Sequence, residues 1–146
     1  MRVEPAGEDG WFQNVPLTAN RLDLERVSVT LHKDDGDAEL AWKDDFVMSG
    51  DAARSESTVT ADVVFVGFGV HAPDMNYSDY DGIDIKGKIV ALFSGAPAAF
   101  PHNERAFYSS GRTKADEMVR RGAVGYIGLR SRVDQKRYPW EVLTLN

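Results

Sequence analysis

The segment Ala61–Gly95 constrains the fold more than any other part of the chain. It contains two near-continuous apolar runs, Val63–Val70 and Ile89–Phe93, separated by an acidic connection that carries tyrosines. Short apolar runs rich in Val, Ile and Phe and bounded by Gly, Pro and Asp indicate buried strands. Strands that are apolar on both faces need cover on both faces, so these two are expected in the middle of a layered domain.

Downstream of this segment the sequence predicts a strand, a helix and a second strand. The expected elements are a strand at Lys88–Ser94, a long loop at Gly95–Phe107, a helix at Tyr108–Arg121 and a strand at Ala123–Leu129. Thr113–Asp116 resembles a capping box, so the firm part of the helix is expected from Thr113 onward. Gly122 is expected as its C′ residue. This spacing implies a right-handed parallel crossover.

Upstream, the pattern predicts a hairpin. Arg21–His32 alternates apolar and polar residues, with a break near Glu25–Arg26, and Leu40–Met48 gives a second strand. The Asp-Gly turn between them favours positive φ. The predicted fold class is therefore α/β, a mixed β-sheet with few helices, with an N-terminal hairpin and a C-terminal βαβ unit. Residues 1–15 are expected as a lead-in and residues 16–146 as a single domain.

Composition excludes several classes of function. The 146 residues fit one globular domain, and the net charge of −6 argues against a nucleic-acid partner. No apolar run reaches the length of about 18 residues that a membrane span needs. The absence of cysteine excludes disulfides, a thiol nucleophile and cysteine-type zinc sites. Basic residues gather in Arg105–Arg137, which indicates either a docking face or, as we favour, a solvated helix surface.

Motifs that would carry chemistry are incomplete. Gly67–Ala72 fits the G-x-G-x-x-A dinucleotide fingerprint, but Pro73 and a turn-rich segment follow where a helix is required, so nucleotide binding is rejected. The glycines are instead expected to allow a strand-end bend. No G-x-S-x-G elbow occurs. We therefore predict no catalytic residue in this chain.

Two acidic clusters raise the question of calcium. The first is the turn Asp34, Asp35, Asp37 and Glu39, and the second is the loop Ala72–Asp84, with Asp74, Asp79, Asp81 and Asp84. The first cluster lacks the twelve-residue loop of an EF-hand, which ends in glutamate. A solvated turn is favoured for the first cluster, and calcium at the second remains a further hypothesis.

Four ordered pieces carry a family resemblance. They are Val66-Gly67-Phe68-Gly69, the Tyr77–Gly82 element, Asp84–Val90 and Arg121–Gly125. With them the chain resembles a protease-associated (PA) domain, more narrowly the type inserted in secreted two-zinc aminopeptidases. The lead-in PAGEDGWFQNVPL is also similar to the stretch that precedes this insert in such peptidases. The resemblance implies a structural role for five glycines: Gly67, Gly69, Gly82, Gly87 and Gly122.

The resemblance implies a swivelling β/β/α-type domain that borders a peptidase active site and helps to select substrates or partners without hydrolysing them. It implies zinc in the parent catalytic domain, an extracytoplasmic location and that domain as partner. The N-terminal MRVEPAGEDG lacks the pattern of a signal peptide. His32-Lys33-Asp34 formally matches the zinc motif His-x-Asp but stands at a turn without further ligands, so no metal ligand is assigned.

Two loops are the candidate recognition elements, Ala72–Asp84 and Gly95–Tyr108. Aromatic and arginine side chains give large contact areas, which suits recognition. The candidate recognition residues are Tyr77, Tyr80, Phe100, His102, Arg105, Tyr108 and Arg112. The alternative for each tyrosine, which we favour, is a loop anchor packed on the sheet.

Two functions stay open. The first is a non-catalytic domain of a zinc-dependent aminopeptidase, contacting the parent catalytic domain and peptide substrate. The second is a free-standing module that binds a peptide or a carbohydrate. The apolar end Trp140–Leu145 favours the first, because it suggests a chain that continues past Asn146.

Overall fold

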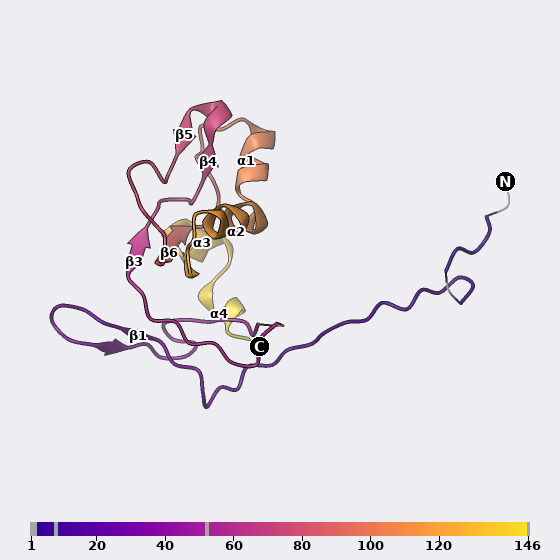
Figure 1. Ribbon diagram of the computed structural model, residues 1–146, viewed down its shortest axis with the longest axis horizontal. Helices are drawn as coiled ribbons and strands as arrows, with labels where there is room; N and C mark the ends of the chain where they lie inside the picture. The colour runs from indigo at the N-terminus through magenta and orange to yellow at the C-terminus, as the bar shows by residue number, and fades with distance from the viewer. Residues whose placement is uncertain (1–2, 8, 52, 146) are drawn as a thin grey trace. The chain divides into compact units, whose positions relative to one another are not determined.

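The computed structural model describes residues 3–7, 9–51 and 53–145. They group into two compact units, Met1–Ser57 and Thr58–Asn146 (Figure 1). The chain has mixed sheets and few helices, so the predicted α/β class is confirmed. A lead-in over residues 1–15 and a single domain over 16–146 stay predictions.

The first unit contains the predicted hairpin in a much shorter form. Strands β1 (Thr30–Leu31) and β2 (Ala38–Glu39) pair antiparallel, with Leu31 opposite Ala38. Gly36 in the turn has φ 124°, a conformation that favours glycine. None of the described residues in this unit is buried.

The predicted strands Arg21–His32 and Leu40–Met48 are therefore wrong in extent. In the second, Asp45 accepts a hydrogen bond from Ala41 N at 2.8 Å with its carboxylate and donates its own N–H to Ala41 O at 2.9 Å. A short acidic side chain that bonds nearby backbone competes with strand pairing, and here it closes a turn. The expected break near Glu25–Arg26 is a turn in which Arg26 N donates to Asp23 O.

The second unit is built on a three-stranded parallel sheet of order β3-β6-β7. The strands are β3 (Val63–Phe65), β6 (Ile89–Phe93) and β7 (Gly125–Leu129). β6 lies in the centre, with Val90 opposite both Val64 and Tyr126. The parallel β6–β7 pair with α2 (Gly111–Arg120) between its strands is the predicted βαβ unit.

The apolar run Val63–Val70 is not one strand, which corrects the prediction. β3 ends at Phe65, and the chain turns at Gly67 and Gly69, both at positive φ. It then enters a hairpin of β4 (His71–Ala72) and β5 (Tyr77–Ser78), joined by the 3-10 turn η1 (Pro73–Met75). Only this short turn follows the G-x-G-x-x-A fingerprint, where nucleotide binding requires a helix.

The segment expected as a loop before α2 contains a helix, α1 (His102–Tyr108). Pro101 is its N-cap, where the missing N–H of proline costs no helical bond. α2 begins at Gly111, and Ser110 Oγ accepts a hydrogen bond from Thr113 N. The expected start at Thr113 was therefore wrong, because the cap lies three residues earlier.

Two further short helices follow the sheet. α3 (Arg132–Arg137) begins with a capping box made by Ser131 and Asp134, and α4 (Trp140–Leu143) occupies the apolar end of the chain. Across the described part of the chain, none of the helices has the length and apolarity needed to cross a membrane.

Two clusters of buried residues form the core, and both lie in the second unit. The first packs one face of the sheet against α2 and the loop before β6: Val66, Tyr80, Ile85, Val90, Leu92 and Met118. The second joins Val70, Ala72 and Ala96, with partly buried aromatic residues around them. The two clusters fix the positions of β4, β5, α1 and α2 relative to the sheet.

Candidate functional site

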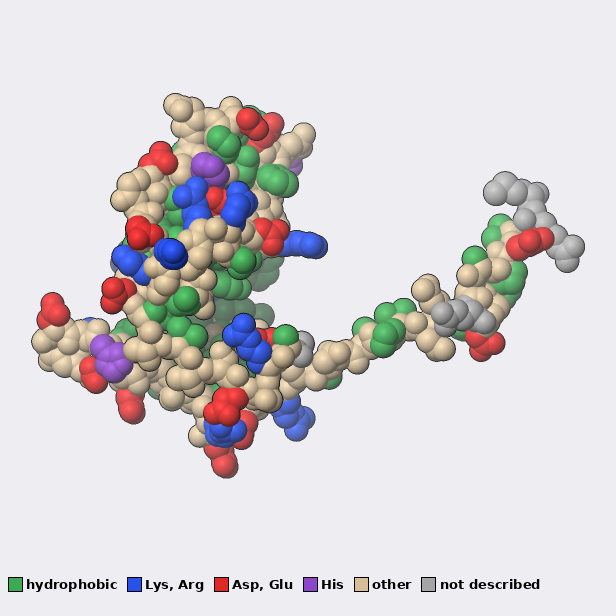
Figure 2. Space-filling model, in the orientation of Figure 1, with side chains coloured by type: hydrophobic (Ala, Val, Ile, Leu, Met, Phe, Trp, Pro, Cys, Tyr) green, Lys and Arg blue, Asp and Glu red, His purple; other side chains and the backbone are tan. Residues whose placement is uncertain are grey.

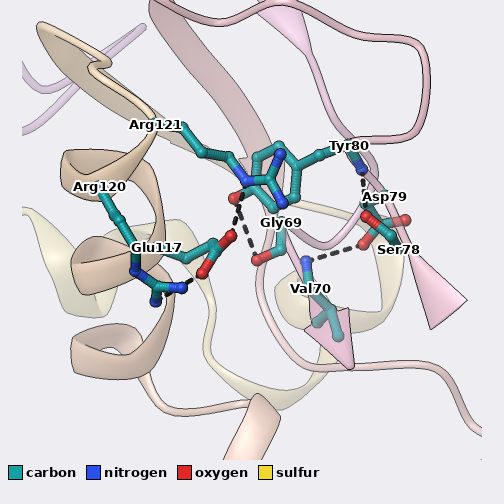
Figure 3. A network of polar contacts seen from close by, with 8 residues as sticks. All are labelled: Gly69, Val70, Ser78, Asp79, Tyr80, Glu117, Arg120 and Arg121. Carbon is teal, nitrogen blue, oxygen red and sulfur yellow. Dashed lines mark hydrogen bonds and ion pairs between the residues drawn. The ribbon is translucent and has the colours of Figure 1, made fainter. Parts of the chain in front are cut away.

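The glycine turn after β3 is held by the carboxylate of Asp79. Its Oδ2 accepts hydrogen bonds from Phe68 N (3.1 Å) and Val70 N (2.9 Å), and Figure 3 shows the latter contact. Tyr77 Oη donates to Asp79 Oδ1 at 2.6 Å. A Cβ at Gly67 would stand 2.7 Å from Asp79 Oδ1, so only glycine fits at this φ of 58°. Asp79 is thus a structural clamp of the turn.

Tyr80 links this turn to α2. Its buried hydroxyl donates to Gly69 O at 3.2 Å, and Arg121 stacks over the ring with its guanidinium carbon 4.5 Å from the centroid. Glu117 accepts from Arg121 Nε and Arg120 at 2.6 Å each (Figure 3). Burial, followed by the charge of Glu117, raises the pKa of Tyr80 to about 12, so this phenol stays protonated at neutral pH.

A buried lysine caps the carboxyl end of β6. Lys114 is 4% exposed, and its Nζ donates to Phe93 O at 3.2 Å and to Gly95 O at 2.5 Å. Burial lowers the pKa of Lys114, while the charge of Asp79 acts in the opposite direction. The two carbonyls leave this ammonium group satisfied, which is what a buried cation requires.

An aromatic cluster joins the two loops that the sequence singled out. Phe100 makes edge-to-face contacts with Tyr77 and Tyr108, with centroid distances of 5.3 and 5.8 Å, and Phe107 contacts Tyr108 at 5.0 Å. These geometries are the preferred ones for aromatic pairs. Burial, then the hydrogen bond and charge of Asp79, raise the pKa of Tyr77 to about 12.

Beside this cluster lies a cavity of about 290 Å³. It is lined by β4 and the residues on either side of it, by α1 and by α2: Gly69, Val70, His71, Pro73, Phe107, Tyr108, Thr113, Lys114, Glu117 and Arg120. The walls combine aromatic surface with one carboxylate and two cationic side chains. Such a mixture suits a small ligand, or one side chain of a larger ligand, that is both apolar and polar.

The predicted recognition residues have different places in the structure. Tyr108 lines the cavity, and Phe100 contacts the rings of both Tyr108 and Tyr77 without lining it. Tyr80 is buried in the first core cluster, as its alternative reading expected. Three others are exposed and do not line this cavity: His102, Arg105 and Arg112.

The sequence-based selection missed the polar wall of the cavity. Lys114, Glu117 and Arg120 follow one another at helical spacing on α2, next to its apolar face. This spacing could have identified them from the sequence, because residues three or four apart share one side of a helix. His71 also lines the cavity, and its buried Nδ1 has no hydrogen-bond partner among the described residues.

The five predicted structural glycines all have positive φ. Their φ angles are 58° for Gly67, 65° for Gly69, 74° for Gly82, 71° for Gly87 and 82° for Gly122. Basic side chains gather over α2 and α3 (Figure 2), and those of Arg112, Arg120 and Arg132 are exposed. The basic segment Arg105–Arg137 thus includes a solvated helix surface.

Neither acidic cluster of the sequence forms a metal centre within residues 3–7, 9–51 and 53–145, where no group of three or more potential ligands is gathered. In the first cluster, Asp37 pairs with His32 Nδ1 at 2.8 Å. In the second, Asp79 is directed to backbone amides, as described above. His32 is therefore part of the hairpin turn.

Comparisons with known proteins found no relative of this chain. Nothing matches this chain among protein-family models, curated proteins or solved structures.

Proposed function

We propose that the chain is a non-catalytic recognition domain of the PA type, belonging to a zinc-dependent aminopeptidase and bordering its active site. The observation that carries the proposal is the meeting of the two candidate loops. Tyr77 from the first loop and Tyr108 from the second contact the same ring, Phe100, and Tyr108 also lines the cavity. A surface made by two converging loops suits recognition of a peptide.

The cavity offers complementary contacts to a peptide. Phe107 is 60% exposed and Tyr108 partly so, which leaves aromatic surface for an apolar side chain. Arg120 is bound to Glu117 through one nitrogen and is largely exposed, so its other N–H groups can donate to a peptide carbonyl or carboxylate. Hydrolysis, in this proposal, belongs to the zinc-bearing catalytic domain of an extracytoplasmic parent enzyme, which is also the partner of this domain.

A titration tests the recognition step. A short peptide with a free amino terminus is added to the isotope-labelled chain, and amide shifts are followed by NMR. We expect saturable shifts at Val70, His71 and Thr113, weakened in Tyr108→Ala. The control Tyr138→Ala removes an exposed tyrosine outside the cavity, 56% exposed, and is expected to bind normally. No saturable shift at the cavity residues would contradict the proposal.

The parent enzyme is tested separately. Reading the gene past codon 146 should reveal His-x-Asp and carboxylate motifs of a two-zinc site. The longer protein should release amino acids from peptides and lose this activity on chelation, whereas the 146-residue chain should have none. A reading frame that ends directly after Asn146 would contradict the parent assignment and leave the binding result untouched.

The second candidate is a free-standing binding module, and the exposed ring of Phe107 at the cavity favours it. Aromatic faces stack on sugars as well as on peptide side chains. The same NMR titration with oligosaccharides separates the two, because a carbohydrate module should bind them and show no response to the peptide.

A further inference from the structure

Strand β7 forms an unprotected edge of the sheet. Within the described residues it pairs only with β6. Natural edges are usually blunted by charges, proline or bulges, because unpaired backbone groups recruit other strands. Residues 122–129, GAVGYIGL, contain neither a charged residue nor proline, and Tyr126 is 64% exposed. The opposite edge strand, β3, is only three residues long and follows the charged Asp62.

The direction of the free backbone groups follows from the pairing with β6. In the central strand β6, Ile89 N donates to Asp62 O at 2.9 Å and Ala91 O accepts from Val66 N at 3.0 Å, so both residues face β3. In a parallel pair, alternate residues direct both their N–H and C=O groups to the same neighbour. Val90 and Leu92 therefore face β7, and in the register Val90–Tyr126 and Ala91–Ile127 it is Ile127 that directs its backbone groups to β6. The outward residues are therefore Tyr126 and Gly128.

We infer that β7 pairs antiparallel with β7 of a second copy of this chain, in a register centred on Ile127. In that register Ile127 lies opposite Ile127 of the second copy, and Gly125 lies opposite Leu129. The outward residues Tyr126 and Gly128 of each copy then exchange backbone hydrogen bonds with Gly128 and Tyr126 of the other. A shift of the register by two residues leaves an outward residue of β7 without a partner in the other strand.

The side chains of the strand are self-complementary in the same register. Tyr126 lies opposite Gly128 of the second copy, so a large ring meets a residue without a side chain. The structure has open space at Gly128, where an added Cβ would meet nothing within 4 Å. Cross-strand pairs of this kind stabilise sheets, and an aromatic ring can cover an edge glycine.

The chemistry of the edge points to a copy of this chain as its occupant. The strand carries no charge that would repel its own copy. When two copies run antiparallel, two large residues of one strand, Tyr126 and Leu129, lie opposite glycines of the other. A two-fold pairing uses the β7 edge of both copies, so the assembly closes at two chains. The product is a dimer with one continuous sheet, β3-β6-β7 from each copy.

Cysteine cross-linking tests the register, because the chain has no cysteine of its own. Tyr126→Cys and Gly128→Cys chains are made separately and then mixed under mild oxidation. Opposed residues at this hydrogen-bonded position have Cα atoms about 5.5 Å apart, within reach of a disulfide. We expect mixed disulfide dimers to form on the order of tenfold faster than dimers of either chain alone, because pairing holds the thiols at millimolar effective concentration. Equal rates in all three samples would overturn the register.

Sedimentation velocity of the intact 146-residue chain tests the dimer itself. We expect a concentration-dependent dimer that Ile127→Lys abolishes, since it places two like charges at the symmetry axis. The matched control Val63→Lys changes a half-exposed residue on the opposite edge, 50% exposed, and should leave the dimer intact. Circular dichroism verifies that both variants fold. A monomer at every concentration, or equal loss in both variants, would overturn the proposal, as would growth into larger species.

Discussion

At the scale of single residues, two carboxylates turned into the protein organise the second unit. Asp79 holds the backbone of the glycine turn, and Glu117 holds two arginines, one of which covers Tyr80. The side chain of Glu117 is only 9% exposed, so the two arginines take the place of water as partners of its carboxylate. Hydrogen bonds to charged groups contribute more than neutral ones.

Glu117→Gln should therefore lower the free energy of unfolding by about 1–3 kcal/mol, because it removes the charge that both arginines need. Urea denaturation followed by circular dichroism measures the loss. Glu104→Gln, an exposed acid on α1, is the control and should change stability little. Equal stability of both variants would show that the arginine contacts contribute nothing.

The two tyrosines with raised pKa values make stability depend on alkaline pH. The pKa of Tyr77 rises from 10.0 in its ordinary state to about 12 in the fold, and that of Tyr80 does the same. Between these values the unfolded chain loses the phenol protons while the folded chain keeps them. Their contribution is full below pH 10 and is lost as pH rises toward 12.

Tyr77→Phe should consequently show a shallower loss of stability over this range, by up to about 1.4 kcal/mol per pH unit. Urea denaturation at a series of alkaline pH values gives the slope. Tyr138→Phe, at an exposed position, is the control and should keep the slope of the natural chain. A slope that Tyr77→Phe leaves unchanged would mean that Tyr77 titrates alike in both states.

At the scale of elements, α2 is fixed at its C-terminus by a Schellman motif. Ala123 N donates to Met118 O at 3.0 Å and Gly122 N to Val119 O at 2.9 Å, and Gly122 has φ 82°. The motif reverses the chain from the helix into β7.

Gly122→Ala should cost about 1–2 kcal/mol, because an L-residue is strained at this φ and its Cβ would lie 3.3 Å from Lys86 Cγ. Gly111→Ala, at the start of the same helix and with open space around it, should leave stability unchanged or raise it by up to about 1 kcal/mol. Thermal unfolding of both variants measures the difference. Destabilisation of the same size in both would contradict the role of the φ angle.

The sequence predicted the elements whose signal is local and strong. β6 and the end of α2 at Gly122 follow from an apolar run and from C′ chemistry, and both are as expected. α1 was missed because Pro101 was taken to break structure, although proline is compatible with a helix start. The strand Leu40–Met48 was wrong because Asp45 closes a local turn that the alternation of residues does not reveal.

The candidate site could be predicted only in part, for a similar reason. Tyr77, Phe100 and Tyr108 were selected because aromatic residues in loops are conspicuous. Lys114 and Glu117 were not selected, since charged residues on a helix are usually solvated, and only the packing of α2 against the glycine turn buries them.

At the scale of the whole molecule, the two units differ in how they are held. Both core clusters and the cavity belong to the second unit, whereas no described residue of the first unit is buried. The first unit is held by a two-residue ladder and isolated turns. A region with few buried contacts opens at low free-energy cost, so local unfolding should be concentrated there.

Limited trypsin digestion of the intact chain should accordingly cut the first unit before the core of the second. Among the described residues of the first unit, the exposed cleavage sites are Arg21, Arg26, Lys33 and Arg54. We expect an early product that begins at Ser55, identified by mass spectrometry, while Arg112 and Arg120 within α2 stay uncut because a packed helix does not fit a protease cleft. Cleavage at those two arginines at the same rate as at Arg26 and Arg54 would contradict the difference between the units.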